Sequence, residues 1–429
     1  MSTSRMKTLI KNGHIVDPGN NVDRVSDILT ENGKISRIAE NIKAEADNVI
    51  DATGKLVIPG LVDMHVHLRE PGREDKETIA TGTRAALKGG VTTLLAMPNT
   101  QPPIDCAENV TLLKNIIKKT ANANVLVAGS ITRNRLGREL TDISQFKKEN
   151  VLAISDDGLS VDNDNLMLEA LKRAQEEGIL VICHSEDRSL SAGGVVNLGF
   201  TSTRMGLKGI SRESEYKRVE RDIRLAQEAG SALHIAHVSC RESVELIAAA
   251  RKKGARVTCE TAPHYCVLDE ETVLAYDTNM KMNPPLRGKE DVRAIKQGLK
   301  DETINAIASD HAPHTENEKA IEFERAEFGV IGLETTLAVS ITALVVPGIL
   351  SWPELVAKLT FNPAKILGIN KGTLGIDSDA DIVVVSADAE WCVEKTGFVS
   401  KSKNSAFLGR TLKGVVEYTI LGGRIVYKK

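Results

Sequence analysis

This sequence has few aromatic residues, no excess of basic residues and no apolar run that reads as a membrane span. Phe, Trp and Tyr make up 3% of the 429 residues, too few for the stacking surfaces that single-stranded nucleic acids need. The net charge is −3, so no basic surface for nucleic acid or an anionic membrane is expected. The most apolar stretch, residues 333–349, contains Glu334 and a Pro-Gly pair, which favours a buried helix over a membrane span.

Signals for export and for a disulfide framework are missing as well. Residues 1–12 lack the apolar stretch of a signal peptide. The six cysteines form no C-x-x-C pair and have no framework spacing, so we expect reduced thiols in the cytoplasm. Apolar residues make up 41% of the chain and charged residues 26%, which is typical of a folded globular protein.

The chain contains two kinds of hydrophobic pattern. Residues 1–55 and 373–429 show short segments of alternating apolar and polar residues with Gly and Asn at the breaks, which predicts strands. Because short sheets rarely stand alone, we expect both ends of the chain to form one small β domain. Between them, residues 56–372 alternate apolar runs with amphipathic segments of helical length, the pattern of βα units.

The central region contains eight apolar runs, the number of strands that closes a (β/α)8 TIM-type barrel. The runs are Leu56–His67, Val91–Met97, Asn124–Ser130, Val151–Ser155, Ile179–His184, Ala232–Val238, Ala255–Glu260 and Ile304–Ser309. Helices are expected at Lys76–Lys88, Asn163–Glu177, Glu242–Lys253 and Lys289–Asp301. Such barrels carry their active site at the carboxyl ends of the strands, and polar residues gather at those ends here.

His65 and His67 end the first run and are the strongest local signal for a metal site. Side chains two apart share a face of a strand, so both imidazoles can bind one ion. The pair alone is equally compatible with two packed histidines. Four other runs also end in His or Asp, and a closed barrel brings these ends together: Asp156, Asp157, His184, His237 and Asp310. Imidazole and carboxylate without thiolate favour Zn2+.

Longer motifs surround these residues and are specific in combination. They include His65-Val-His-Leu-Arg-Glu-Pro-Gly, Ser155-Asp-Asp-Gly, Met282-Asn-Pro-Pro-Leu-Arg, Ser309-Asp-His-Ala-Pro-His and Phe328-Gly-Val-Ile-Gly-Leu-Glu-Thr. With them the chain resembles, over effectively its whole length, the bacterial class I dihydroorotases of the amidohydrolase superfamily. The resemblance implies a hydrolase of cyclic amides that reversibly cyclises N-carbamoyl-L-aspartate to L-dihydroorotate in de novo pyrimidine synthesis.

The resemblance also implies one or two Zn2+ ions per subunit. It implies that His65, His67 and Asp310 bind one zinc. It implies that His184 and His237 bind a second, bridged to the first by an aspartate of the Ser155-Asp-Asp-Gly motif. The spacing to His184 favours Asp157 over Asp156 as the bridge. Asp310, beside the metal, is expected to carry the proton between the attacking water and the amide nitrogen.

A carboxylate on the substrate ring requires a cation away from the metal. Arg69 offers a planar fork that matches a carboxylate. The resemblance implies that further residues bind the substrate with it: Asn99, Asn283, His314, and the backbone at Phe328 and Gly329. The charged segment Thr315–Glu327 follows the eighth run, and we expect it to be a mobile loop over the site.

The remaining histidines, His14, His234, His264 and His311, are not assigned to the metal. His234 lies three residues before His237, so it is expected to face the opposite way and pack against a helix. By the same reasoning His311 points away from Asp310. A role for His264 in ordering the site stays open.

Three rival functions are distinguishable. A dihydropyrimidinase or allantoinase would have a lysine at the fourth strand and lack Arg69. A non-catalytic, dihydroorotase-like partner of aspartate transcarbamoylase would lose metal ligands, and a single-zinc deaminase would have no use for Arg69 or a bridging aspartate. We expect a small-molecule substrate, a homodimer, and a possible association with aspartate transcarbamoylase.

Overall fold

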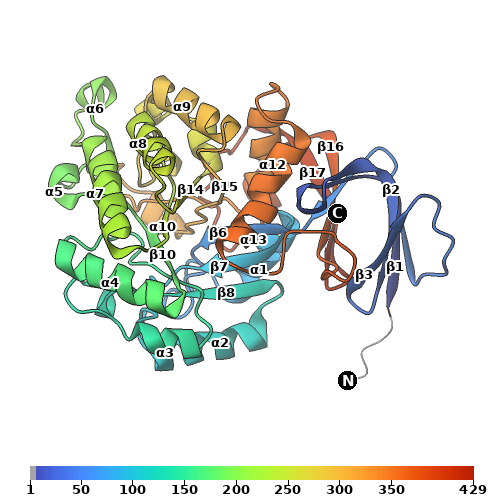
Figure 1. The fold of residues 1–429 in the computed structure, drawn as a ribbon. Helices are drawn as coiled ribbons and strands as arrows, with labels where there is room; N and C mark the ends of the chain where they lie inside the picture. The colour runs from blue at the N-terminus through green and yellow to red at the C-terminus, as the bar shows by residue number, and fades with distance from the viewer. Residues whose placement is uncertain (1–5) are drawn as a thin grey trace.

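The computed structural model describes residues 6–429. Within this range the chain forms two eight-stranded sheets and one two-stranded sheet of β11 (Val196–Asn197) and β12 (Gly209–Ile210). The first large sheet is the barrel at one end of the molecule, and the second lies at the other end and contains both termini of the described chain (Figure 1).

The barrel sheet is parallel throughout and follows the order of the chain. Its strands are β6 (Leu61–Val66), β7 (Val91–Ala96), β8 (Asn124–Gly129), β9 (Ala153–Ile154), β10 (Leu180–Cys183), β13 (Leu233–Ile235), β14 (Val257–Thr261) and β15 (Ala306–Ile307). A parallel bridge between Val66 and His311 joins the first strand to the segment after the last and nearly closes the barrel. The predicted TIM-type fold is therefore confirmed.

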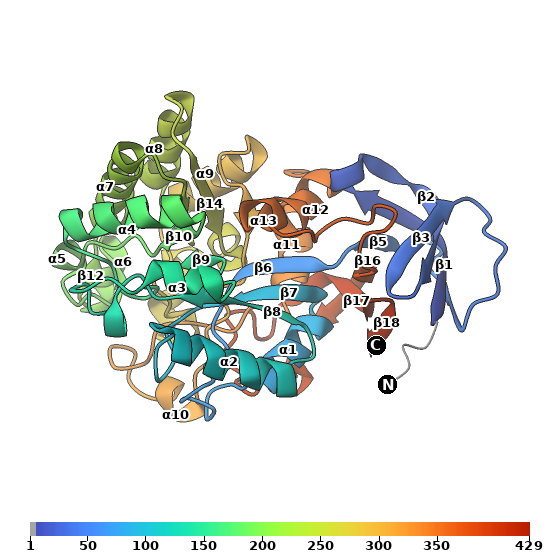
Figure 2. The same ribbon diagram turned by 60° about the horizontal axis from the view of Figure 1, so that its bottom comes forward.

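Helices follow most barrel strands and lie outside the sheet (Figures 1 and 2). The longer ones are α1 (Ile79–Lys88), α2 (Ala107–Thr120), α3 (Ile143–Lys148), α4 (Asp164–Glu177), α7 (Glu213–Ala229), α8 (Arg241–Lys252), α9 (Lys289–Lys300), α12 (Trp352–Leu359) and α13 (Phe361–Ile366). Shorter ones are α5 (Arg188–Ser191), α6 (Phe200–Met205), α10 (Glu316–Lys319) and α11 (Thr336–Ser340), which continues as a π-helical turn, Ile341–Val345. Helix α1 begins three residues later than predicted because Thr78 caps it, its hydroxyl accepting from the Thr81 N–H at 3.1 Å.

Two apolar layers explain why the barrel strands read as continuous hydrophobic runs. The interior is filled by residues such as Val62, Met64, Leu95, Ile182 and Ala236. A second, larger cluster packs between the outer face of the sheet and the helices. Both faces of each strand are thus buried, and the alternation of a half-exposed strand is lost.

The terminal sheet combines both ends of the chain, as predicted. Its order is β18 (Arg424–Lys428), β17 (Thr411–Leu421), β16 (Ile382–Cys392), β5 (Leu56–Pro59), β1 (Lys7–Asp17), β2 (Val22–Glu31) and β3 (Lys34–Ala39), with β4 (Asn48–Asp51) paired to β1. Strand β5 lies between β1 and β16 and joins the two ends of the chain within one sheet.

The first predicted run, Leu56–His67, is one strand in the prediction but two strands in the structure. Leu56–Pro59 pairs in the terminal sheet and Leu61–Val66 pairs in the barrel, so the chain changes sheet at Gly60, not at the expected boundary after residue 55. A side chain is excluded at Gly60, because a Cβ atom there would lie 2.2 Å from the Thr92 Oγ1 atom. One glycine inside an apolar run marks the change of sheet.

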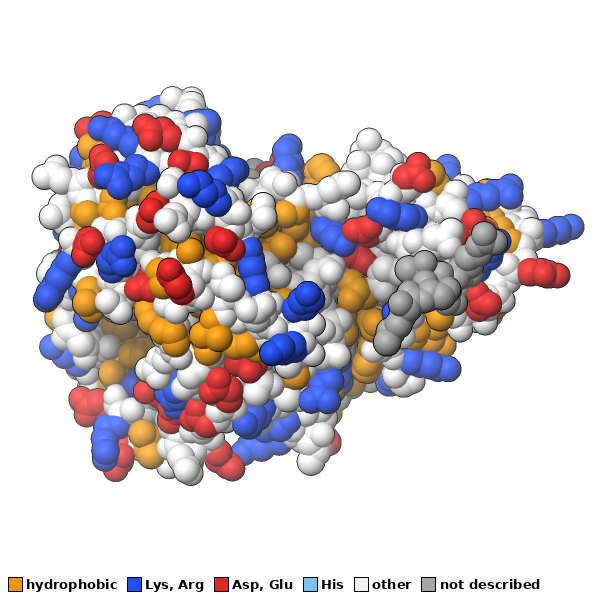
Figure 3. Space-filling model, turned by 90° about the horizontal axis from the view of Figure 1, so that it is seen from below, with side chains coloured by type: hydrophobic (Ala, Val, Ile, Leu, Met, Phe, Trp, Pro, Cys, Tyr) orange, Lys and Arg blue, Asp and Glu red, His pale blue; other side chains and the backbone are white. Residues whose placement is uncertain are grey.

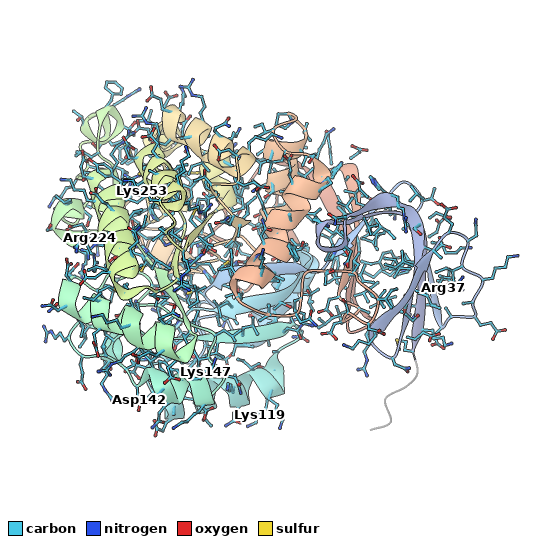
Figure 4. All side chains as sticks on the ribbon, in the orientation of Figure 1. Arg37, Lys119, Asp142, Lys147, Arg224 and Lys253 are labelled. Atoms are coloured by element: carbon cyan, nitrogen blue, oxygen red, sulfur yellow. The ribbon has the colours of Figure 1, made fainter. Side chains whose placement is uncertain are left out.

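Charged side chains of both signs cover the outside of the molecule. Acidic and basic groups are interspersed on the face seen in Figure 3. Lys119, Lys147 and Arg224, labelled in Figure 4, are exposed on helices, and the labelled Arg37 is exposed on strand β3. No helix among the described residues is long and apolar enough to cross a membrane.

Candidate metal centre

Six side chains from five barrel strands converge at the carboxyl ends of those strands. They are His65, His67, Asp157, His184, His237 and Asp310, the residues predicted as metal ligands, and all six are buried. Potential ligand atoms of His65, Asp157 and His237 lie within 4.8 Å of one another, as do those of His65, His67 and Asp310. The barrel therefore brings together residues up to 245 positions apart in sequence.

The His65 ring lies between two carboxylates, those of Glu260 and Asp157. Its Nδ1 atom lies 2.9 Å from the Glu260 Oε1 atom and donates to it. The neutral imidazole then has its lone pair on Nε2, which lies 3.2 Å from the Asp157 Oδ1 atom. Both atoms are buried and neither has a hydrogen-bond partner. Two acceptors facing each other in a buried site fit a cation held between them.

The His67 side chain is oriented in the same way. Its Nδ1 atom lies 2.9 Å from the Asn99 Oδ1 atom, so it donates there, and Nε2 lies 3.3 Å from the Asp310 Oδ1 atom. The Asn99 amide donates to the Asp157 Oδ2 atom at 3.3 Å. Asn99 therefore holds a histidine and the central aspartate in fixed relative positions.

A second histidine pair lies near the Asp157 oxygen atom that faces His65. The His184 Nδ1 and His237 Nε2 atoms are 2.8 Å apart and lie 3.8 Å and 3.7 Å from the Asp157 Oδ1 atom. Glu186 orients His184, its Oε2 atom lying 3.2 Å from Nε2. One carboxylate between two histidine pairs is suited to bridge two ions, and the mixed nitrogen and oxygen donors fit Zn2+ better than Mg2+ or Ca2+.

The neighbouring Asp156 faces a different part of the molecule. Its Oδ1 atom accepts from the N–H groups of Ile131 at 2.9 Å and Thr132 at 3.0 Å. The carboxylate thereby fixes the loop after β8 and is unavailable to the histidine cluster. The geometry supports the choice of Asp157 over Asp156.

Burial and positive charge act in opposite directions on Asp310. Burial would raise the pKa of its carboxyl group, but the surrounding histidines, first His67 and then His65 and His237, lower that pKa well below its usual range. Asp310 also has a left-handed backbone, φ 47°, as do His237 at 36° and Arg69 at 62°. Three non-glycine residues in this region at one site indicate local strain, which the surrounding structure maintains.

Arg69 forms the second part of the site. Its Nε atom donates to the Pro313 carbonyl at 3.1 Å, and Nη2 lies 3.3 Å from the His314 Nε2 atom. Burial lowers the pKa of the guanidinium to about 10, which leaves it charged at neutral pH. No carboxylate of residues 6–429 is within ion-pair distance of Arg69, so a half-buried cation lies beside the histidine–aspartate cluster without an anionic partner.

His314 and the backbone of Phe328 and Gly329 lie next to Arg69. The His314 Nε2 atom donates to the Phe328 carbonyl at 2.7 Å, and Nδ1 accepts from the Lys76 ammonium at 3.1 Å. Gly329 has φ 122°, and a Cβ atom there would lie 2.6 Å from the Ala312 Cβ atom, so the segment requires glycine.

Asn283 is connected to the histidine–aspartate cluster through Glu186. Its amide donates to the Glu186 Oε2 atom at 3.0 Å, the same atom that faces His184. A cavity of about 660 Å3 is lined by Gly158, Glu186, Asn283 and Phe328, among others, and provides room for a small molecule. Of the six residues predicted to bind substrate, Asn99 contacts the histidine–aspartate cluster and Asn283 and Phe328 line this cavity. Arg69 and His314 contact each other, His314 contacts the Phe328 carbonyl, and Gly329 follows Phe328.

The prediction for His234 was wrong. Its ring lies inside the barrel, with Nδ1 2.8 Å from the Thr258 Oγ1 atom and Nε2 3.4 Å from the Glu260 Oε2 atom. Strand β13 ends at Ile235, so the alternation of faces does not extend to His237, whose left-handed backbone turns its side chain inward as well.

The other histidines lie outside the cluster, as expected. His14 is on the terminal sheet with Asp23, and His311 points away from Asp310, its Nδ1 accepting from the Gly332 N–H at 3.1 Å. His264 is buried, its Nε2 atom has no partner, and burial lowers its pKa to about 4.

Sequence reasoning missed three side chains that support the site: Glu260, Glu186 and Lys76. Glu260 contacts His65, Glu186 contacts His184, and Lys76 contacts His314. Glu260 ends the seventh apolar run, and a charged residue at that position was the one available signal. The expected loop Thr315–Glu327 contains α10 and the buried Phe323, and its mobility stays a prediction.

Comparison with known proteins agrees with this geometry. Residues 54–243 match a family model described as dihydro-orotase-like, and residues 346–427 match one described as amidohydrolase family. A dihydroorotase of Elusimicrobium minutum is 50% identical over 98% of this chain and 97% of its own length. One of Geobacter metallireducens is 48% identical over 99% and 100%. The solved L-hydantoinase (dihydropyrimidinase) of Arthrobacter aurescens superimposes with a TM-score of 0.90 at 27% identity, covering 98% of this chain and 96% of that one.

Proposed function

Because this chain belongs to the dihydroorotase family of amidohydrolases, we propose that it is a zinc-dependent enzyme that interconverts N-carbamoyl-L-aspartate and L-dihydroorotate. The observation that carries the substrate assignment is Arg69, a half-buried guanidinium without a carboxylate partner beside the histidine–aspartate cluster. Dihydroorotate has one carboxylate on its ring, and a planar guanidinium can bind it through two parallel hydrogen bonds.

Six side chains would hold the metal. His65, His67 and Asp310 face one position, His184 and His237 face a second, and Asp157 lies between the two pairs. A bound Zn2+ ion lowers the pKa of coordinated water to about 7 and polarises a carbonyl oxygen. Glu260, Asn99 and Glu186 fix which ring nitrogen of three of the histidines is free.

Asp310 carries the proton in this proposal. Its low pKa keeps it ionised at neutral pH, so it accepts a proton from the attacking water. The ring C–N bond then breaks, and Asp310 returns that proton to the departing nitrogen. In the biosynthetic direction the same carboxylate takes the proton from the ureido nitrogen as it attacks the side-chain carboxyl group and water leaves.

The substrate is held at both ends by the remaining residues. We propose that Arg69, Asn99 and His314 bind the ring carboxylate, and that Asn283 and the backbone at Phe328–Gly329 bind the amide edges of the ring. Their arrangement supports this, since they surround the metal cluster and the adjacent cavity. Fixed donors on both sides hold the scissile amide next to Asp310.

Metal analysis of protein purified without added zinc, together with an assay on dihydroorotate, tests the proposal. We expect one or two zinc ions per chain and activity that a chelator removes. Arg69→Ala should raise KM at least 100-fold with unchanged zinc content. A wild-type enzyme that hydrolyses dihydrouracil as readily as dihydroorotate would instead assign the chain to the dihydropyrimidinase type.

Rival assignments have specific weaknesses. The fold neighbours include hydantoinases, but the dihydroorotase relatives are nearly twice as similar in sequence. The fourth strand ends in aspartates without a lysine, and all six metal-binding positions are present, unlike the pattern expected of a non-catalytic partner.

We further propose a cytoplasmic homodimer able to associate with aspartate transcarbamoylase. The six cysteines are all unpaired, which fits a reducing compartment. Gel filtration of the protein, alone and mixed with the transcarbamoylase, tests both associations. A monomeric elution volume, or two unshifted peaks in the mixture, would contradict them.

A further inference from the structure

The chain between β16 and β17 leaves the terminal sheet and packs against the barrel. In this connection, Ser400, Ser402, Asn404 and Phe407 are all buried, with at most 5% of their surface exposed. A surface connection between two strands is normally exposed and polar. Part of this connection is instead buried, so the polar side chains in that part must have partners inside the molecule.

Asn404 makes three side-chain hydrogen bonds to the chain that follows β15, two as donor and one as acceptor. Its Nδ2 atom donates to the carbonyls of Ala312 and Gly329, each at 3.2 Å. Its Oδ1 atom accepts from the His314 N–H, also at 3.2 Å. The Asn404 carbonyl accepts from the Ile331 N–H at 3.0 Å.

These contacts join two segments, the second of which begins beside Phe328, a residue that lines the proposed substrate cavity. Ala312 and His314 follow the proton carrier Asp310, and Gly329 follows Phe328, whose carbonyl accepts from His314. The two segments are so close that a Cβ atom on Gly329 would overlap Ala312. Asn404 donates to both carbonyls at this approach, and the Gly329 carbonyl also accepts from the Lys319 ammonium at 3.0 Å.

Ser400 and Ser402, two other residues of the connection, form hydrogen bonds to the loop that follows β6. The Ser402 hydroxyl donates to the Lys76 carbonyl at 2.7 Å, and the Lys76 ammonium donates to His314. Ser400 donates to Glu77, which also contacts His311. The connection therefore holds the loop Asp310–His314 both directly and through two buried residues of the loop after β6.

We propose that Asn404 is a positioning residue for substrate binding, through which the terminal β domain sets the geometry of His314 and Gly329. The inference rests on the proposed function of these two residues. Asn404 itself contacts no metal ligand side chain, so its loss should affect the substrate and leave the metal centre intact.

Kinetics of Asn404→Ala and Asn404→Asp test the proposal in the full-length zinc enzyme. Asn404→Ala should raise KM for dihydroorotate at least 10-fold, lower kcat less than 3-fold, and leave zinc content unchanged. Asn404→Asp keeps the acceptor for the His314 N–H but places a carboxylate against two carbonyls, so its KM should rise at least as much. Asn362→Ala is the matched control, because Asn362 donates to the Asn305 carbonyl at 2.8 Å, away from the substrate cavity.

The analogue orotate separates a positioning role from a loss of stability. Its dissociation constant should rise by the same factor as KM in both Asn404 variants and stay within 2-fold of wild type in Asn362→Ala. Unchanged KM and orotate affinity in a folded Asn404→Ala protein would overturn the inference. An equal rise in the control variant would also overturn it, since the effect would then follow from general destabilisation.

Hydrogen exchange keeps the inference separable from the proposed function. In Asn404→Ala, amides in residues 310–331 should exchange at least 10-fold faster, with the other barrel loops unchanged. Faster exchange in a protein whose wild type does not turn over dihydroorotate would support the positioning role and reject the substrate. Unchanged exchange would reject the positioning role whatever the activity.

Discussion

Asp310 combines three properties at one residue: burial, a left-handed backbone, and a carboxylate 3.3 Å from the Nε2 atom of His67. We predict that Asp310→Asn lowers kcat at least 1,000-fold, because an amide cannot carry a proton and general base catalysis contributes roughly 100- to 10,000-fold. Zinc content should stay near wild type, since an amide oxygen can still face the ion. Turnover near the wild-type rate in a zinc-loaded variant would contradict the proton-carrying role.

Glu260 fixes the His65 ring through the nitrogen that faces away from the cluster. We predict that Glu260→Gln weakens zinc binding about 10- to 100-fold, the usual effect of losing a carboxylate behind a metal-binding histidine. Competition with a zinc chelator measures this. Glu334→Gln, which changes a buried glutamate bonded to the backbone of Val399 and Ser400, is the control and should bind zinc normally.

Single residues also show what a sequence can reveal. The six residues of the histidine–aspartate cluster could be predicted because each lies at or just after the end of an apolar run and belongs to a recognisable motif. Glu260 and Asn404 were not, because their importance depends on partners 195 and 90 residues away that no local pattern indicates. The prediction that His234 and His237 face opposite ways failed because it assumed a regular strand up to His237, whereas β13 ends at Ile235.

At the scale of elements, Gly60 separates a strand of the terminal sheet from a strand of the barrel. We predict that Gly60→Ala lowers the free energy of unfolding by about 1–3 kcal/mol, because the new Cβ atom would overlap the Thr92 side chain. The melting temperature measures the effect. Gly397→Ala, where a Cβ atom would meet nothing within 4 Å, should be nearly neutral. Equal losses in both variants would mean that crowding at Thr92 is not the cause.

Element boundaries followed from the sequence less well than element types. The eight runs predicted the eight barrel strands because strands buried on both faces are apolar throughout. The same property concealed the division of the first run, since β5 and β6 are both buried and only Gly60 lies between them. Capping at Thr78 similarly moved the start of α1.

At the scale of the whole molecule, the candidate metal centre joins the first and last strands of the barrel. We predict that a chelator lowers the melting temperature by about 5 °C or more, because a ligand that binds only the folded state stabilises it. Without an ion, the Nε2 atom of His65 and the Oδ1 atom of Asp157 are buried acceptors without partners. Added zinc should restore the melting temperature. A His65→Ala variant should show a smaller shift; a full shift in that variant would place the stabilising ion elsewhere.

The bridge between Val66 and His311 joins the first barrel strand to the segment after the last one. His65 and His67 contact Asp310 across the same junction. Closure of the barrel and assembly of the cluster therefore depend on the same contact between the first strand and the segment after the last. A nascent chain on the ribosome contains His65 and His67 long before Asp310 is synthesised, and Asn404 emerges later still. The cluster can therefore be complete only after 310 of the 429 residues have been synthesised.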